Sequence, residues 1–179
     1  MALGHVAARD GRGRNPVDRP RDRLGAEVRH RRGYYAVPDA PPDEVQARME
    51  AVAQVPVEAQ TLSLTARLEA VPGEVGTWNV RMELDAREIS LQHQQGRWAG
   101  TLNILFAQKD ASGAIVASSH QSLELRLEQA TYDRLLRDGM KMSKSVTLEP
   151  GAQELRIVVQ DAGSGATGSV HVPLARISR

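Results

Sequence analysis

The feature that most constrains the fold is the stretch 96–128, in which apolar side chains recur at every second position. The sequence there reads GRWAGTLNILFAQKDASGAIVASSHQSLELRLE. Apolar residues fall on even numbers in its first half and on odd numbers in its second half: Trp98, Leu102, Ile104 and Phe106, then Ile115, Leu123, Leu125 and Leu127. A period of two is typical of strands with one buried face, so the stretch predicts one long β-hairpin.

The centre of this stretch predicts a tight turn. Residues 110–113, Asp-Ala-Ser-Gly, suit a type I turn, with Asp in the first position and Gly supplying a positive φ at the close. A loop of even length puts both apolar sets on one face, whereas a three-residue loop breaks that match. The pairs expected from an even loop are Trp98 with Leu125, Leu102 with Gln121, Phe106 with Ala117, and Gly100 with Leu123. The last pair predicts a bulge or a close approach at Gly100.

A hairpin with one apolar face is marginal in water, so the rest of the chain must supply an opposing layer. Alternating apolar residues predict further strands over 61–69, 78–84, 89–91, 140–148, 155–159 and 170–174. We expect Pro-Gly turns at 71–74 and 149–151. The last two strands should pair across a loop at 162–167, with Pro173 at a sheet edge because it lacks an N–H.

Two short helices interrupt the strand pattern. Helical spacing over 132–136, followed by Gly139 at the left-handed end position, predicts a crossover helix from one sheet to the other. Helical spacing over 45–52 predicts a second helix, capped by Asp43 and ended by Pro56, that covers the sandwich core as a lid. The predicted fold class is all-β, an immunoglobulin-like antiparallel β-sandwich of about seven or eight strands with a short N-terminal helix and one crossover helix. A jelly roll or a small barrel is the alternative.

Charge divides the chain into unlike parts. Residues 1–33 carry nine Arg against three Asp and one Glu, net +5, which leaves −4 for the remainder of a chain with net charge +1. We interpret 1–33 as an Arg-rich disordered arm or a remnant of a preceding domain, 34–56 as a Pro-rich linker with the short helix, and 57–179 as the β-sandwich domain. Candidate interaction residues at the end of the arm are Arg29, Arg31, Arg32, Tyr34 and Tyr35.

Composition excludes several kinds of chemistry. The chain has no Cys, which rules out disulfides, thiol catalysis and Cys-ligated metals. No run approaches the roughly 18 apolar residues of a membrane span, and the start lacks the apolar segment of a secretory signal. We therefore expect no membrane span and find no signal peptide in the chain as written. Aromatic residues make up 3% of the chain, which weakens any proposal of stacking platforms for sugars or bases.

One motif matches a cofactor pattern only formally. Residues 163–168, GSGATG, spell G-x-G-x-x-G directly after the apolar segment LRIVV. A dinucleotide site needs the third Gly to open a helix, then a second strand and an acidic residue about 20 positions on. Only eleven strand-like residues follow Gly168. We interpret the motif as a hairpin loop and predict no cofactor.

The other polar residues form no catalytic or metal-binding pattern. The five His have no metal-ligand spacing, and His120 and His171 are expected on outward faces in water. Residues 110–114 approach the pattern of a metal-ion-dependent adhesion site but lack its last hydroxyl, so they are interpreted as the turn. Trp78 and Trp98 have inward parity and predict core residues. The carboxylates interpreted as solvated surface groups are Asp85, Glu88, Asp133 and Asp161.

Several stretches together carry a resemblance to a known family: residues 30–36 (HRRGYYA), GRW at 96–98 with TLNILFAQKD after it, TYDRLLRDGM from Thr131, and LEPGAQELRIVVQD with GSVHVPL. Over 31–174 the chain resembles the C-terminal portion of bacterial von Willebrand factor A-related proteins of the Acidobacteria type. The resemblance implies a β-sandwich that follows a von Willebrand A domain, and an exported parent protein. The A domain itself is absent, so its metal-dependent adhesion is carried over to no residue, and the chain is interpreted as a truncated or mis-started product.

These observations lead to three functional hypotheses. The first is a non-catalytic structural or protein-interaction module beside a von Willebrand A-type domain, with a protein partner and no nucleic acid. The second is a carbohydrate-binding sandwich that uses Trp78 or Trp98. The third is nucleic-acid contact through the Arg-rich arm.

Overall fold

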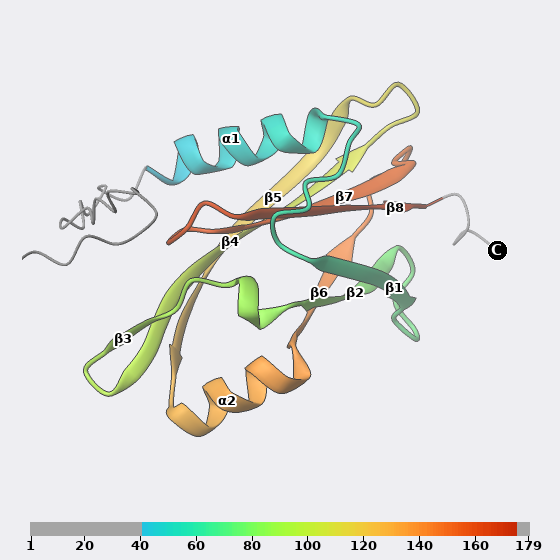
Figure 1. Ribbon diagram of the computed structural model, residues 1–179. Coiled ribbons are helices and arrows are strands. Elements are labelled where there is room, and N and C mark those ends of the chain that lie inside the picture. The colour runs from blue at the N-terminus through green and yellow to red at the C-terminus, as the bar shows by residue number, and fades with distance from the viewer. Residues whose placement is uncertain (1–40, 175–179) are drawn as a thin grey trace, which may run out of the picture. The chain divides into compact units, whose positions relative to one another are not determined.

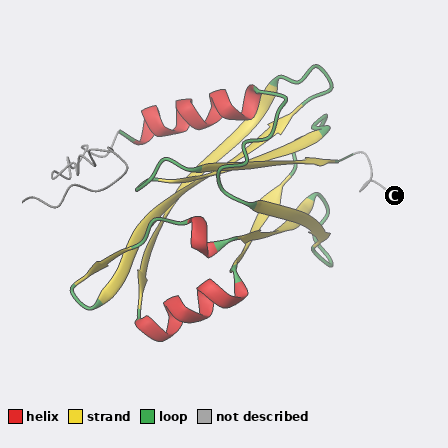
Figure 2. Cartoon of the chain, in the orientation of Figure 1, coloured by secondary structure: helices red, strands yellow, loops and turns green. Residues whose placement is uncertain are grey.

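The computed structural model describes residues 41–174, which form eight strands, two α-helices and a short 3-10 helix (Figures 1 and 2). The helices are α1 (Pro42–Gln54) and α2 (Gln129–Asp138), and the 3-10 helix is η1 (Ala86–Glu88). The strands are β1 (Leu64–Ala70), β2 (Thr77–Leu84), β3 (Gln92–Gln94), β4 (Arg97–Lys109), β5 (Ile115–Leu127), β6 (Met140–Thr147), β7 (Glu154–Asp161) and β8 (Thr167–Pro173). The candidate interaction residues Arg29, Arg31, Arg32, Tyr34 and Tyr35 lie outside the described residues.

The strands form two antiparallel sheets. One has three strands in the order β1-β2-β6, and the other has five, with β4 at its centre. β5 pairs with one side of β4, while β7 and then β8 follow on the other side, where β3 also pairs with the start of β4. The predicted all-β sandwich is confirmed, and neither sheet closes into the alternative barrel.

Inward side chains of the two sheets make one core. The alternation predicted from the sequence holds, because alternate residues in the central parts of β2, β4 and β7 are buried in this core. Its central members are Val80, Met82, Leu84, Leu102, Ile104, Phe106, Leu155, Ile157 and Val159.

The β4–β5 hairpin is present, but its predicted register is wrong by two residues. Leu102 lies opposite Leu123, and Phe106 lies opposite Ser119. The type I turn is as predicted, since the N–H of Gly113 donates to the carbonyl of Asp110 over 3.0 Å and Gly113 has φ +83°. The N–H of Asp110 also donates to the carbonyl of Ala114 over 3.0 Å, which leaves a three-residue loop.

A bulge repairs the parity that a three-residue loop breaks. Gln108 lies opposite Ala117 but Lys109 lies opposite Ile115, so Val116 has no residue across from it. The extra residue places Leu123, Leu125 and Leu127 on the face of the β4 apolar residues as predicted, whereas Ile115 lies on the other face, in the cluster with α1. The close approach expected at Gly100 is also present, although the neighbour is Leu91: a Cβ on Gly100 would lie 2.6 Å from the Cδ2 of Leu91.

Helix α1 covers the outer face of the five-stranded sheet (Figure 1). Met49 and Ala53 of the helix pack with Leu105, Ala107 and Val158 of the sheet in a second, smaller apolar cluster. The expectation of a lid over the main core is therefore wrong, because α1 has an apolar core of its own. The predicted cap at Asp43 is wrong as well: the helix begins at Pro42 after Pro41, and no side chain caps it.

Helix α2 connects the two sheets as predicted, running from β5 to β6. Gly139 follows it with φ +72°, and its N–H donates to the carbonyl of Leu135 over 2.9 Å. The strand expected at 89–91 is displaced, because β3 spans Gln92–Gln94 and Ile89 precedes it as a buried core residue.

The β7–β8 hairpin closes through the glycine motif. Gly165 has φ +77° and its N–H donates to the carbonyl of Asp161 over 2.8 Å, so the glycine motif makes a hairpin turn as expected, although its last two residues, Thr167 and Gly168, already belong to β8. Ile157 lies opposite Val170, a pairing two residues away from the one implied by a 162–167 loop. β8 ends the strand order of its sheet, which places Pro173 on an edge strand.

Candidate functional site

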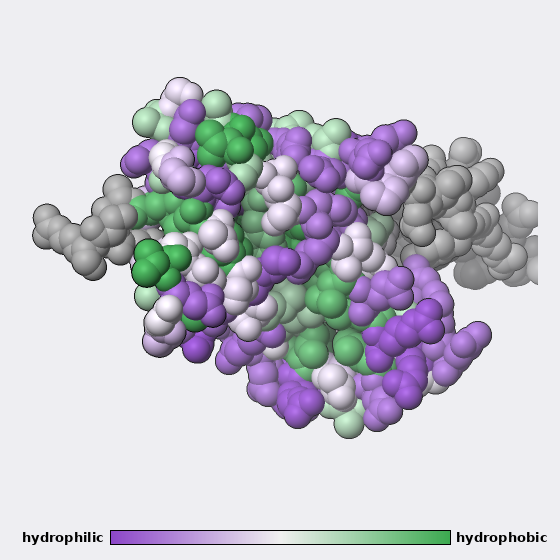
Figure 3. Space-filling view, turned by 180° about the vertical axis from the view of Figure 1, so that it is seen from behind, coloured by the Kyte–Doolittle hydropathy of each residue, from purple (hydrophilic) through white to green (hydrophobic). Residues whose placement is uncertain are grey.

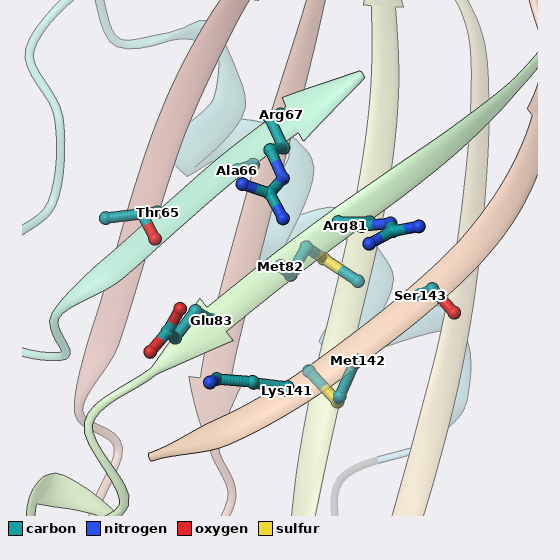
Figure 4. A pocket seen from close by; sticks show the side chains of 9 residues that line it. All are labelled: Thr65, Ala66, Arg67, Arg81, Met82, Glu83, Lys141, Met142 and Ser143. Carbon is teal, nitrogen blue, oxygen red and sulfur yellow. The ribbon is translucent and has the colours of Figure 1, made fainter. Parts of the chain in front are cut away.

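The three-stranded sheet carries a hollow of about 470 Å³ lined by all three of its strands (Figure 4). Antiparallel pairing aligns the outward residues of β1, β2 and β6 in rows across the sheet. One row runs from Arg67 through Arg81 to Ser143, and the next runs from Thr65 through Glu83 to Lys141. Three positive side chains from three strands therefore line one surface.

The two arginines of this hollow oppose each other directly. Like charges at directly opposite positions destabilise a pair of strands unless a counter-charge is close. Glu69 supplies it: its Oε1 lies 3.4 Å from the Nε of Arg67, and its Oε2 lies 2.8 Å from the Nε of Arg81. The side chains of Arg67 and Arg81 are 71% and 51% exposed, so these contacts hold them in place with little net energy.

Donors remain available in the hollow. Glu69 is contacted through the Nε atoms, and no residue of 41–174 accepts from the terminal guanidinium nitrogens of Arg67 and Arg81. Lys141 is exposed and likewise has no ion-pair partner within that range. The fork of each guanidinium matches the geometry of a carboxylate or phosphate group. The arrangement can bind anions from the solvent side.

A second, polar hollow of about 430 Å³ lies on the five-stranded sheet, away from the first. It is lined by residues of β3, the start of β4, the end of β5 and the β7–β8 loop. Glu124 and Arg126 of β5 contribute one charge of each sign. With no excess of either sign among its lining residues, this hollow does not favour a particular class of ligand.

Trp78 and Trp98 are both half-buried, and neither belongs to the core. The prediction that they are core residues is therefore wrong. The ring of Trp98 stacks on Tyr132 of α2 at 4.1 Å between centroids, and His93 meets it in a T-shaped contact at 5.2 Å. The Nε1 of Trp98 donates to the Oε1 of Gln129 over 2.9 Å. These contacts attach α2 to the sheet, and a sugar stacking on the ring would compete with Tyr132.

The histidines differ in their surroundings. His171 is exposed as expected, and its Nδ1 lies 3.0 Å from the Oε1 of Glu58, which also accepts from the backbone N–H of His171 over 3.1 Å. These hydrogen bonds, the backbone one first, lower the pKa of Glu58. His120 is only half-buried, but its Nε2 is shielded from water and has no partner among the described residues. The expectation of a fully solvated His120 is therefore wrong.

The carboxylates that were expected on the solvated surface differ in their burial. Asp85 caps η1 by accepting from the N–H of Arg87 over 3.0 Å, and Glu88 is an exposed partner of Ser63. Asp161 is fully buried, which contradicts its assignment to the solvated surface. In the 110–114 turn, Oδ1 of Asp110 accepts from the hydroxyl and the N–H of Ser112, and these bonds lower the pKa of Asp110. Residues 41–174 contain no group of three His, Asp or Glu arranged to hold a metal.

The arginines of the first hollow were not singled out from the sequence. Their outward parity was visible, but a turn confined to 71–74 does not place Arg67 opposite Arg81. The connection is longer, with β1 ending at Ala70 and β2 beginning at Thr77, and both Gly73 and Gly76 adopt positive φ. Only this longer reversal brings the two side chains together.

No family model matches the chain, and no curated protein matches it. Within the described part of the chain, neither α-helix has the length and apolar character needed to cross a bilayer.

Proposed function

We propose that this chain is a non-catalytic protein-interaction module that binds an acidic segment of a partner protein on the outer face of the three-stranded sheet. The observation that carries the proposal is the direct cross-strand opposition of Arg67 and Arg81, with their terminal guanidinium nitrogens free among the described residues. Glu69 offsets only one of the two positive charges, and a bound carboxylate supplies the second counter-charge.

The shape of the surface supports a peptide as the ligand. The hollow extends across β1, β2 and β6, with Arg67 and Arg81 in one row and Lys141 in the next, beside the carboxylate of Glu83 (Figure 4). The hydroxyl of Ser143 lies in the row of the two arginines, and that of Thr65 lies in the row of Glu83; both add neutral hydrogen-bonding positions. A segment with acidic residues separated by small polar ones fits this pattern of charges.

The position of the module beside a von Willebrand A-type domain is also part of the proposal. It rests on the resemblance of residues 31–174 to the region that follows such a domain, and on the predicted sandwich fold that this region implies. An acidic surface or linker of a neighbouring domain has the chemistry that the hollow requires.

Fluorescence anisotropy with a labelled peptide of alternating Glu and Ser tests the proposal. We expect binding that weakens as salt is added, because the contacts are charged and exposed. Arg81→Gln should weaken it by about tenfold, which corresponds to ~1.4 kcal/mol. Arg134→Gln is the matched control, since Arg134 is an exposed arginine on α2, away from the hollow. Equal affinities for the Arg81→Gln and Arg134→Gln variants would contradict the proposal.

A further inference from the structure

The longest free sheet edge of the described chain belongs to β5. This strand has thirteen residues, Ile115–Leu127, and β4 is its only strand partner among residues 41–174. No backbone group of β5 bonds to any other described segment. A row of unpaired N–H and C=O groups of this length is a template for another strand.

The edge strands β8 and β6 have features that oppose the addition of another strand. The free side of β8 is covered by the segment that precedes β1. There the N–H of Ser169 donates to the carbonyl of Ala59 over 2.9 Å, and Gln60 forms a β-bridge with Gly168. β6 carries Lys141 and Lys144, and charged edge residues oppose strand addition. β5 has neither Lys nor Pro, and its central residues 117–122, ASSHQS, contain no Asp, Glu, Lys or Arg.

We infer that β5 pairs with β5 of a second copy of this chain, antiparallel and centred on Gln121. Gln121 is the midpoint of the strand, so this register pairs the regular part of β5, residues 117–125, with the same part of the second copy, and the bulge at Val116 lies beyond its end. An antiparallel pair about a two-fold axis is self-complementary, as the contact between identical subunits requires.

The side chains of β5 fit this register in size and charge. Leu123 of one copy lies opposite Ser119 of the other, and Leu125 lies opposite Ala117, so each large residue meets a small one. These leucines already contact the main core, and the pairing extends that apolar layer from one molecule to the next. Glu124 falls opposite Ser118, and Arg126 falls opposite Val116, so no like charges oppose each other.

Pairing at β5 is independent of the proposed function. The Arg67–Arg81 hollow lies on the three-stranded sheet, whereas β5 is the edge of the five-stranded sheet. Peptide binding and self-association therefore succeed or fail separately in experiments.

Single-cysteine variants of the full chain test the register, because the natural chain has no Cys. Gln121→Cys places two thiols opposite each other at about 5 Å between Cα atoms, within the reach of a disulfide. Ser119→Cys places its thiols about four residues apart along the strands, roughly 13 Å, which is too far. We expect a covalent dimer from the first variant under mild oxidation and none from the second. Equal cross-linking of both variants would overturn the inference.

Gln121→Glu tests the free energy of the pairing. In each copy the Oε1 of Gln121 accepts from the Nζ of Lys144 over 2.8 Å, and a carboxylate keeps that contact. In the dimer the same change sets two carboxylates opposite each other across the axis. We expect light scattering to show a dimer for the natural chain and a dissociation constant raised about two- to fivefold by Gln121→Glu, with circular dichroism unchanged.

Gln153→Glu is the matched control, because Gln153 is exposed and lies outside β5. It should leave the dimer intact. A natural chain that is monomeric at all accessible concentrations would overturn the inference. A monomer whose β5 amides are protected from hydrogen exchange would overturn it too, and would assign the edge to another segment of the same chain.

Discussion

At the scale of single residues, Asp161 shows how a buried carboxylate organises a loop. Its side chain is fully buried and accepts from the N–H groups of Ser90 at 3.0 Å, Gly163 at 3.2 Å and Ser164 at 3.2 Å, and from the hydroxyl of Ser164. Hydrogen bonds to an ionised acceptor are stronger than neutral ones. One carboxylate therefore fixes the β7–β8 loop and attaches the 89–91 segment to it.

Replacement of Asp161 by Ala should destabilise the fold strongly. The N–H groups of Ser90, Gly163 and Ser164 would lose their shared acceptor, at a cost of about 2–4 kcal/mol. Urea unfolding followed by circular dichroism measures the loss. The control Asp138→Asn changes an exposed carboxylate at the end of α2 and should shift stability by less than about 0.5 kcal/mol. Similar losses in the two variants would show that Asp161 does not hold the loop.

At the scale of elements, the C-terminal end of α1 is held by cations from the sheet beneath it. The last turn of the helix contains no basic residue. Instead the Nζ of Lys109 donates to the carbonyl of Ala53 over 3.2 Å, and the Nη2 of Arg156 donates to the carbonyls of Val55 and Val57 over 3.2 and 2.8 Å. Cations at this end complement the helix dipole and satisfy carbonyls that the helix cannot.

We therefore expect Arg156 to stabilise the C-terminal end of α1, although it lies on β7. It is the largest fully buried side chain of the described residues. Arg156→Ala removes both volume and donors, and we expect a loss of about 2–5 kcal/mol. Arg156→Met keeps most of the volume and should lose about 1–2 kcal/mol. Both variants should speed hydrogen exchange at 51–57, measured by mass spectrometry.

Arg97→Ala provides the control for Arg156. Arg97 is an exposed strand arginine whose Nη2 lies 3.2 Å from the Oε1 of Glu128, and such a surface ion pair contributes at most about 1 kcal/mol. If Arg156→Ala and Arg97→Ala had the same small effect, the assignment of Arg156 to the end of α1 would be wrong.

The sequence predicted these elements better than it predicted how they pair. The period of two identified the strands of the hairpin, because one face of each must be buried. The register depended on a bulge at Val116 that no local pattern announces, since the extra residue is selected by packing of both apolar sets. Arg156 has outward parity in β7 and so suggests a solvated residue. Its burial follows from α1 and the 55–57 segment lying over that face, a tertiary contact that helical spacing alone does not specify.

The candidate site was less predictable than the fold. Charged residues at outward positions of a strand are the ordinary pattern of a solvated face, and Arg67 and Arg81 match it individually. Their significance depends on which residues oppose each other, and that depends on the length of the connection between β1 and β2.

At the scale of the whole molecule, three carboxylates join segments that are distant in sequence or close a turn. Glu50 connects α1 to β5 by accepting from the hydroxyl of Ser118 over 2.7 Å, and Glu58 connects the segment after α1 to β8 through His171. Asp110 closes the β4–β5 turn. Hydrogen bonds, for Glu50 chiefly those from Gln46 and Ser118, lower the pKa of each of these groups.

These lowered pKa values determine how the stability of the fold changes at acid pH. A carboxyl whose pKa is lower in the folded state stabilises the fold fully above its unfolded pKa of about 4. That contribution is lost as the pH falls through the lower, folded pKa. We therefore expect the urea midpoint to be constant near neutral pH and to fall below about pH 4.

Glu58→Gln should reduce the loss of stability at acid pH. The amide cannot ionise, so the variant loses stability near neutral pH, and its urea midpoint should fall less than that of the natural chain between about pH 5 and pH 3. Glu74→Gln is the control, because Glu74 is an exposed carboxyl in the connection between β1 and β2 with no ion-pair partner among residues 41–174. Glu58 would be excluded as a contributor if both variants followed the natural chain at every pH. A response that is smaller only in Glu58→Gln would place part of the molecule's acid sensitivity at the contact between β8 and the segment that covers its edge.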